Sequence, residues 1–198
     1  MSSVDYNMLI STLESTVVTE YVKEDIPVYT YQSEADLERE FIKNLQNQGY
    51  EYLNIHNEEE LIKWGQRLGS LLQEQDVLVL TGDLGAGKTT FTKGLAQGLG
   101  IKQMIKSPTY TIVREYEGRL PLYHLDVYRI GEDPDSIDLD DFLFGEGVTV
   151  IEWGELLGES LPDDYLKLTL LKKDDGRELV FESQGRRSQE LLEELLHG

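Results

Sequence analysis

Residues 77–90 read VLVLTGDLGAGKTT, an apolar run followed by a glycine-rich turn that ends in a lysine and two threonines. Within this stretch, residues 82–89 fit the pattern G-x-x-x-x-G-K-[ST] of phosphate-binding loops. The apolar run is typical of a buried central strand, and the following TTFTKGLAQGLG predicts a helix that ends at Gly100. Because phosphate binding needs a strand before the loop and a helix after it, we interpret the loop as a nucleotide site rather than a flexible turn.

The residue types of the loop each match a task in phosphate binding. Glycines at Gly85 and Gly87 let the backbone turn, so that several N–H groups and the start of the helix face phosphate oxygens. Lys88 reaches the β- and γ-phosphates, the Thr89 hydroxyl is placed to bind Mg²⁺, and Thr90 can bond the α-phosphate. We therefore expect the nucleotide to be bound by Gly85, Ala86, Gly87, Lys88, Thr89 and Thr90.

A phosphate loop also needs an acid for the magnesium shell, usually at the end of a neighbouring strand. The run GVTVIEWGE leads to Glu152, and LPLYHLDVYR places Asp126 after alternating apolar residues. Alone, Glu152 would be a solvated acid at a strand end, and Asp126 a turn acid or a partner of Arg129. With the loop upstream we expect both acids in the site, and the sequence leaves open whether Asp126 binds metal or positions the attacking water.

A third feature is SPTYT at residues 107–111, where Pro108 fixes its own backbone and biases Ser107 toward extended geometry. The hydroxyls of Ser107 and Thr109 are candidates to contact a γ-phosphate, a nucleophilic water or a partner. The alternative is a plain loop that leads into the strand TIVREY. His124, a lone histidine within a strand-like run, is interpreted as structural.

Composition narrows the classes of function. The chain has 198 residues, no cysteine and a formal net charge of −20. An acidic surface repels phosphate backbones, so we expect no DNA binding, and contact with other nucleic acids only through a partner. The absence of cysteine excludes disulfides, thiolate metal sites and a cysteine nucleophile. No apolar run approaches the ~18–20 residues of a membrane span and the N-terminus lacks the features of a signal peptide, so we expect a cytoplasmic protein.

The pattern along the chain predicts two parts. Residues 1–52 form a helical N-terminal extension, with helical spacing at 4–16 and 33–50 and an extended link between them. Residues 53–198 alternate helices and strands and include a hairpin with Asp175 and Gly176 in its turn. This second part is an α/β domain whose central sheet mixes parallel and antiparallel strands and is flanked by helices. Its first helix begins at Asn57, with Glu60 as the capping-box acid.

Four motifs together resemble a known family. GDLGAGKTT, SPTYTIVREYEG, LYHLDVYR and VIEWGE, in that order and at these separations, are similar to the TsaE family, formerly YjeE. This is a family of small bacterial P-loop ATPases that act in tRNA threonylcarbamoyladenosine biosynthesis. The resemblance runs from about Leu53 to near the C-terminus, and its four ordered motifs make it far more specific than the loop alone.

The resemblance implies a fold, a function and partners. It implies a P-loop NTPase fold and a Mg²⁺-dependent ATPase that works with TsaD and TsaB, hydrolysing ATP to reset the assembly that modifies the adenosine next to the tRNA anticodon. Lys88 and Thr89 match the loop ligands, and Asp126 and Glu152 match the acids tied to magnesium and hydrolysis. The switch region implied by the family comprises Ser107, Pro108, Thr109 and Trp153. The start of the first helix matches the segment on the adenine side, which makes Asn57 and Glu58 further candidates.

The N-terminal stretch is not part of that family's usual pattern. YQSEADLEREFIKNLQNQGYEYL, residues 31–53, resembles the opening helix of type I restriction endonuclease R subunits. The match is short and covers no complete nuclease core, so it implies no nuclease residues. A role in DNA restriction is also disfavoured by the acidic charge.

Two other functions share the same loop. A small-molecule P-loop kinase would need an acceptor pocket and, usually, an arginine-rich lid, and no such segment lies between the loop helix and Glu152. A nucleotide switch that does not hydrolyse would use SPTYT as a segment ordered by the γ-phosphate and recognised by partners. Hydrolysis without any acceptor would argue against the kinase, and hydrolysis in the complex would argue against the pure switch.

Overall fold

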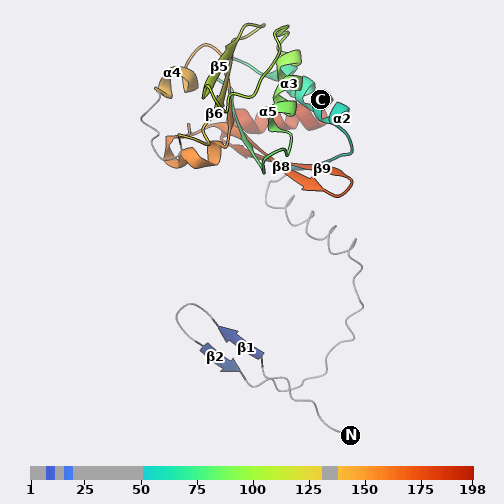
Figure 1. Ribbon diagram of the computed structural model, residues 1–198, viewed down its shortest axis with the longest axis vertical. Helices are drawn as coiled ribbons and strands as arrows, with labels where there is room; N and C mark the ends of the chain where they lie inside the picture. Colours follow the sequence, from blue (N-terminus) through green and yellow to red (C-terminus); the bar gives the residue numbers. More distant parts are fainter. Residues whose placement is uncertain (1–7, 12–15, 20–50, 131–137) are drawn as a thin grey trace. The chain divides into compact units, whose positions relative to one another are not determined.

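The computed structural model describes residues 8–11, 16–19, 51–130 and 138–198 (Figure 1). The chain forms two compact units, Met1–Phe41 and Ile42–Gly198. The helix expected at residues 33–50 lies outside the described residues. The domain boundary expected between residues 52 and 53 falls inside β3 (Glu51–Ile55), a strand of the second unit.

The first unit contains a two-stranded antiparallel sheet of β1 (Met8–Ser11) and β2 (Thr16–Thr19). Helical spacing predicted a helix over residues 4–16, and that prediction is wrong for β1. Leu9 lies opposite Val18, and the β-branched residues of β2 favour extended backbone. Cross-strand pairing, which the local spacing did not reveal, decides the structure of this segment.

The second unit is built on a seven-stranded sheet in the order β3-β9-β8-β4-β7-β6-β5. Its other strands are β4 (Val77–Thr81), β5 (Val113–Tyr116), β6 (Leu122–Asp126), β7 (Val148–Glu152), β8 (Tyr165–Lys173) and β9 (Gly176–Gln184). Its helices are α2 (Glu58–Leu71), α3 (Lys88–Gly98), α4 (Asp140–Leu143), the 3-10 helix η2 (Gly154–Ser160) and α5 (Arg186–His197). Not one of these helices is both long enough and apolar enough to cross a membrane.

Parallel and antiparallel pairs share the sheet, which confirms the predicted mixed α/β architecture. β4 is parallel to both of its neighbours, β7 and β8, and β6 is parallel to β7. The pairs β3–β9, β8–β9 and β5–β6 are antiparallel. The parallel strands β4, β6 and β7 therefore end at one edge of the sheet, where the loop after β4 meets the ends of β6 and β7.

Helices cover both faces of this sheet (Figure 1). On one face α2, α3 and α5 bury Leu61, Leu68, Phe91, Leu95, Leu191 and Leu195. On the other face α4 and η2 bury Leu143 and Leu157 together with Leu125 and Ile151. Because side chains alternate along a strand, neighbouring residues of β7 serve opposite cores, with Val150 in the first and Ile151 in the second.

The helix after the loop is held by unusually close packing between α2 and α3. A Cβ atom at Gly94 of α3 would overlap the carbonyl oxygen of Ile62 in α2. The same close approach occurs at Gly65, Gly69 and Gly98. The position of α3, whose first residue is Lys88, is therefore fixed by backbone contact with α2.

Candidate functional site

The glycine-rich loop joins β4, which is buried along its whole length, to the N-terminus of α3. Its backbone folds into a tight turn in which the N–H of Ala86 donates to the carbonyl oxygen of Asp83 at 3.0 Å. Gly87 has φ 114°, a left-handed conformation that a residue with a Cβ rarely adopts. The strand, loop and helix predicted from the sequence are thus present. The first N–H groups of a helix have no partner within the helix, so the N-terminus of α3 suits an anion.

Lys88 is folded into this loop. Its ammonium group donates to the carbonyl oxygens of Gly82 at 2.6 Å and Asp83 at 3.2 Å, and it lies 3.9 Å from the ring centroid of Trp153. Burial lowers the pKa of Lys88 below its ordinary 10.5, although nearby carboxylates, Glu152 foremost, oppose this shift. A buried ammonium held by carbonyl dipoles and an aromatic face is well placed to bind an anion.

Glu152 and Asp126 end the adjacent parallel strands β7 and β6 and lie opposite one another in the register. Both are buried. Glu152 Oε1 accepts a hydrogen bond from the hydroxyl of Thr89 at 2.8 Å, which joins the acid to the loop. The structure therefore brings together the loop threonine and both acids that the sequence singled out.

The SPTYT segment also reaches the acids. The Thr109 hydroxyl donates to Asp126 Oδ2 at 2.6 Å and lies 2.7 Å from the hydroxyl of Ser107. The second oxygen of Asp126 accepts the N–H of Tyr128 at 3.1 Å. Pro108 is buried, and its carbonyl oxygen accepts the N–H groups that close the turn. The segment is thus a loop, as the plainer interpretation expected, but one in which the Thr109 hydroxyl donates to a site carboxylate.

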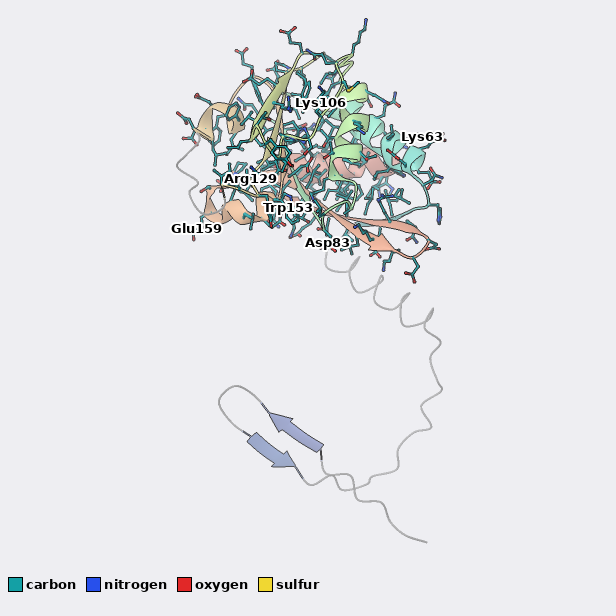
Figure 2. The ribbon with its side chains drawn as sticks, in the orientation of Figure 1. Lys63, Asp83, Lys106, Arg129, Trp153 and Glu159 are labelled. Carbon is teal, nitrogen blue, oxygen red and sulfur yellow. The ribbon has the colours of Figure 1, made fainter. Side chains whose placement is uncertain are left out.

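Trp153 follows Glu152 directly and has a left-handed backbone with φ 62°. This strained geometry for a bulky residue places its ring over Lys88 and 5.1 Å from the ring centroid of Tyr128. Figure 2 shows Trp153 and Asp83 close to one another, as their shared contact with Lys88 requires. Arg129, the alternative partner of Asp126, lies instead over the ring of Tyr110, 4.9 Å from its centroid.

Two of the expected ligands, Asn57 and Glu58, lie at the start of α2. Asn57 is the N-cap of α2 and its Oδ1 accepts the N–H of Glu60 at 2.9 Å, while Glu58 is exposed in the first turn. Glu60 Oε2 accepts the N–H of His56 at 2.7 Å, one residue before the predicted capping-box contact. Within the described part of the chain, neither Asn57 nor Glu58 bonds to residues 82–90, so their role on the adenine side stays a prediction.

Three site residues were not predicted from the sequence. Arg177 of β9 donates to the carbonyl oxygen of Ala86 at 2.6 Å, and Lys172 of β8 donates to that of Leu84 at 2.7 Å. Both contacts arise because the strand order brings the β8–β9 hairpin beside the loop. No local sequence pattern encodes that order. His124 lies 2.9 Å from Glu152 through Nε2. Its position two residues before Asp126, on the same face of a strand, was the available signal.

The donor set fits a magnesium ion bound together with a nucleotide. Among the residues that the structure describes there is no group of three or more histidine, cysteine, aspartate or glutamate side chains able to hold a metal alone. Mg²⁺ instead keeps several waters and is bound through one or two carboxylates plus substrate phosphates. A threonine hydroxyl and a carboxylate 2.8 Å apart at the head of a phosphate loop match that requirement.

Comparisons with known proteins identify relatives of this chain. The family model described as threonylcarbamoyl adenosine biosynthesis protein TsaE matches residues 55–179. The chain is 46% identical over 141 residues to the tRNA threonylcarbamoyladenosine biosynthesis protein TsaE of Bacillus subtilis, covering 70% of this chain and 89% of that protein. It is 47% identical over 120 residues to the protein of that name from Treponema pallidum, covering 60% and 89%. The crystal structure of Bacillus subtilis YdiB superposes with a TM-score of 0.66 at 42% identity, covering 74% of this chain and 93% of YdiB.

Proposed function

This chain belongs to the TsaE family, and from that premise we propose that it is a Mg²⁺-dependent ATPase serving threonylcarbamoyladenosine formation in tRNA. The observation that carries the proposal is the hydrogen bond of 2.8 Å between the Thr89 hydroxyl and Glu152 Oε1. It joins the last residue of the phosphate loop to the acid at the end of the neighbouring strand. That is the arrangement in which P-loop proteins hold magnesium beside the β- and γ-phosphates.

Each residue of the site has a distinct proposed role. Loop N–H groups and Lys88 bind the phosphates, for which the ammonium group leaves its two carbonyl acceptors. Thr89 and Glu152 would hold Mg²⁺, which when bound neutralises charge on the β- and γ-phosphates. Asp126 has its oxygens held by Thr109 and the N–H of Tyr128, and we assign it to positioning the attacking water.

The proposed partners are TsaD and TsaB, with tRNA contacted only through them. Three large side chains are exposed in the segments that form the site: Leu84 of the phosphate loop at 86%, Tyr110 of SPTYT at 84% and Tyr128, against Trp153, at 60%. A partner covering this face would bury them. Direct binding to tRNA is disfavoured because the net charge is −20. The cytoplasm, where tRNA is modified, is the proposed location.

A nucleotide switch is the second candidate, and one contact favours it. The bond between Thr109 and Asp126 couples the SPTYT segment to the site. If nucleotide binding breaks this bond, the segment changes its contacts and a partner can recognise the change. In a pure switch, binding persists while hydrolysis stays negligible even with TsaD and TsaB present.

An ATPase assay with and without TsaD and TsaB separates these functions. We expect slow hydrolysis alone, faster hydrolysis in the complex, and a loss of about 100-fold or more in Lys88→Ala and Glu152→Ala. Matched controls are Lys93→Ala in the same helix and Glu159→Ala in η2, both exposed, which should hydrolyse like the wild type. Wild-type rates in Lys88→Ala or Glu152→Ala would refute the assigned roles.

A further inference from the structure

Among the residues that the structure describes, His124 is a buried titratable residue in contact with Glu152 that the proposed mechanism leaves without a task. It lies in the middle of β6, opposite Arg114 of β5 on one side and Val150 of β7 on the other. Its side chain is completely buried. Its Nε2 lies 2.9 Å from Glu152 Oε1, the oxygen that also accepts from Thr89.

The hydrogen bonds determine which ring nitrogen carries the proton. Nδ1 of His124 is buried and has no hydrogen-bond partner among the described residues. An N–H at Nδ1 would therefore be a buried donor without an acceptor, which is costly. A carboxylate can only accept, so the neutral ring with its proton on Nε2 satisfies the contact with Glu152 and leaves no donor unpaired.

The two donors act on the carboxylate from different directions. Thr89 approaches Glu152 from the loop, and its hydroxyl is a proposed magnesium ligand. His124 approaches from inside the sheet, where β6 and β7 are hydrogen-bonded neighbours. Both donors reach Oε1, while none of the described residues donates to Oε2. The contact from His124 therefore fixes the orientation of the carboxylate independently of the loop.

We propose that His124 is a positioning residue that holds Glu152 ready for magnesium and nucleotide. This inference rests on the proposed function. His124 acts through one hydrogen bond, from its Nε2–H to Oε1 of Glu152, and not through a charge on the ring. Hydrogen bonds to a ligating carboxylate orient it, and losing such a contact typically lowers metal affinity about 10- to 100-fold.

Substitutions that differ in reach test this bond. Glutamine places its amide nitrogen near the position of Nε2, whereas asparagine reaches only as far as Nδ1, and methionine fills the space without a donor. With a fluorescent ATP analogue, the Mg²⁺ concentration needed for half-maximal binding should rise about 10- to 100-fold in His124→Asn and His124→Met. It should stay within about threefold of wild type in His124→Gln, and binding in EDTA should be equal in all four proteins.

Three results would overturn the inference. The first is a wild-type magnesium requirement in His124→Asn or His124→Met. The second is an equal rise of the magnesium requirement in the Gln, Asn and Met variants. The third is a loss of analogue binding that is as large in EDTA as with magnesium. If the wild type itself binds the analogue no better with magnesium than in EDTA, the proposed function fails first, whatever the variants do. These failures are therefore distinguishable.

A measurement on the unmodified chain covers the case in which the variants do not fold. The sequence has three histidines, so the ring nitrogens can be assigned by ¹⁵N NMR of labelled protein. We expect His124 to carry its proton on Nε2 and none on Nδ1. A ring protonated on Nδ1 alone would contradict the proposed hydrogen bond, because Nε2 would then have no proton to donate to Glu152.

Discussion

Lys88 is placed to bind phosphate at a cost in the stability of the fold. Its side chain is only 5% exposed, and it is held by loop carbonyls and the ring of Trp153. The lowered pKa means that the folded state disfavours the charged ammonium relative to the unfolded chain. At neutral pH this group therefore costs folding free energy, and stability recovers only as the pH rises from its lowered pKa toward 10.5.

Removing the charge of Lys88 should affect stability and ATP binding differently. We expect Lys88→Met to have a free energy of unfolding equal to wild type or up to about 1 kcal/mol higher at pH 7, while it loses ATP binding. Urea unfolding and titration with a fluorescent ATP analogue measure the two effects. A variant that is clearly less stable than wild type would show that the lysine contributes to folding instead.

Asp164 predicts a pH dependence of stability. Burial raises its pKa, but the N–H groups of Ser188 and Arg187, at 2.9 and 2.7 Å, outweigh this and hold the pKa below the ordinary 3.8. The stabilisation is therefore complete above pH 3.8 and lost as the pH falls through the lowered value. Asp164→Asn should cost about 1 kcal/mol at pH 7 and progressively less below pH 3.8 in urea unfolding. The control is Asp163→Asn at the exposed neighbouring position. A cost of Asp164→Asn that does not change with pH would contradict the lowered pKa of Asp164.

At the scale of elements, the close contact of α2 and α3 fixes the loop. Gly94→Ala places a methyl group against the backbone of Ile62, so we expect a loss of about 2 kcal/mol or more in the free energy of unfolding. The control is Gln97→Ala, an exposed position in the same helix, which should change stability by less than about 0.5 kcal/mol. Equal stability of Gly94→Ala and wild type would show that the two helices can move apart freely.

The β8–β9 hairpin supports the loop from outside. Arg177→Met removes the donor to the carbonyl oxygen of Ala86, so we expect ATP affinity to fall about tenfold through misplacement of the loop. The control is Arg186→Met, which removes an arginine that is 92% exposed in α5. This variant should bind the ATP analogue as tightly as the wild type does. Titration with a fluorescent ATP analogue measures both, and unchanged affinity in Arg177→Met would show that the loop holds its shape unaided.

Elements and site were predictable from the sequence to different degrees. Strands with strong local patterns, such as β4 and β7, and the cap at Asn57 were predicted because their signals lie within a few residues. Glu152 and Asp126 were found because each ends such a strand. Arg177 and the pairing of β1 with β2 were missed because both depend on contacts between segments that are distant in sequence or whose pairing no spacing reveals.

For the whole molecule, the two units predict where the chain can be cut. We expect residues 42–198 to unfold at the same temperature as the full chain and to hydrolyse ATP equally fast. A chain of residues 53–198 should be less stable, because it lacks Glu51 and Tyr52, which pair with Phe181 and Val180 of β9. Thermal unfolding of the three proteins measures these differences. A markedly lower unfolding temperature for residues 42–198 than for the full chain would show that the first unit contributes to the fold of the second.

The central claim is that ATP hydrolysis at this site sustains threonylcarbamoyladenosine formation. Its most direct test counts the modified tRNA molecules formed per TsaD in a reaction with TsaD, TsaB, tRNA, the threonylcarbamoyl donor and Mg·ATP. With the wild-type chain the count should rise well above one, and with Glu152→Gln it should stop near one because the assembly is not reset. Repeated turnover with Glu152→Gln, or in the absence of this chain, would contradict the account.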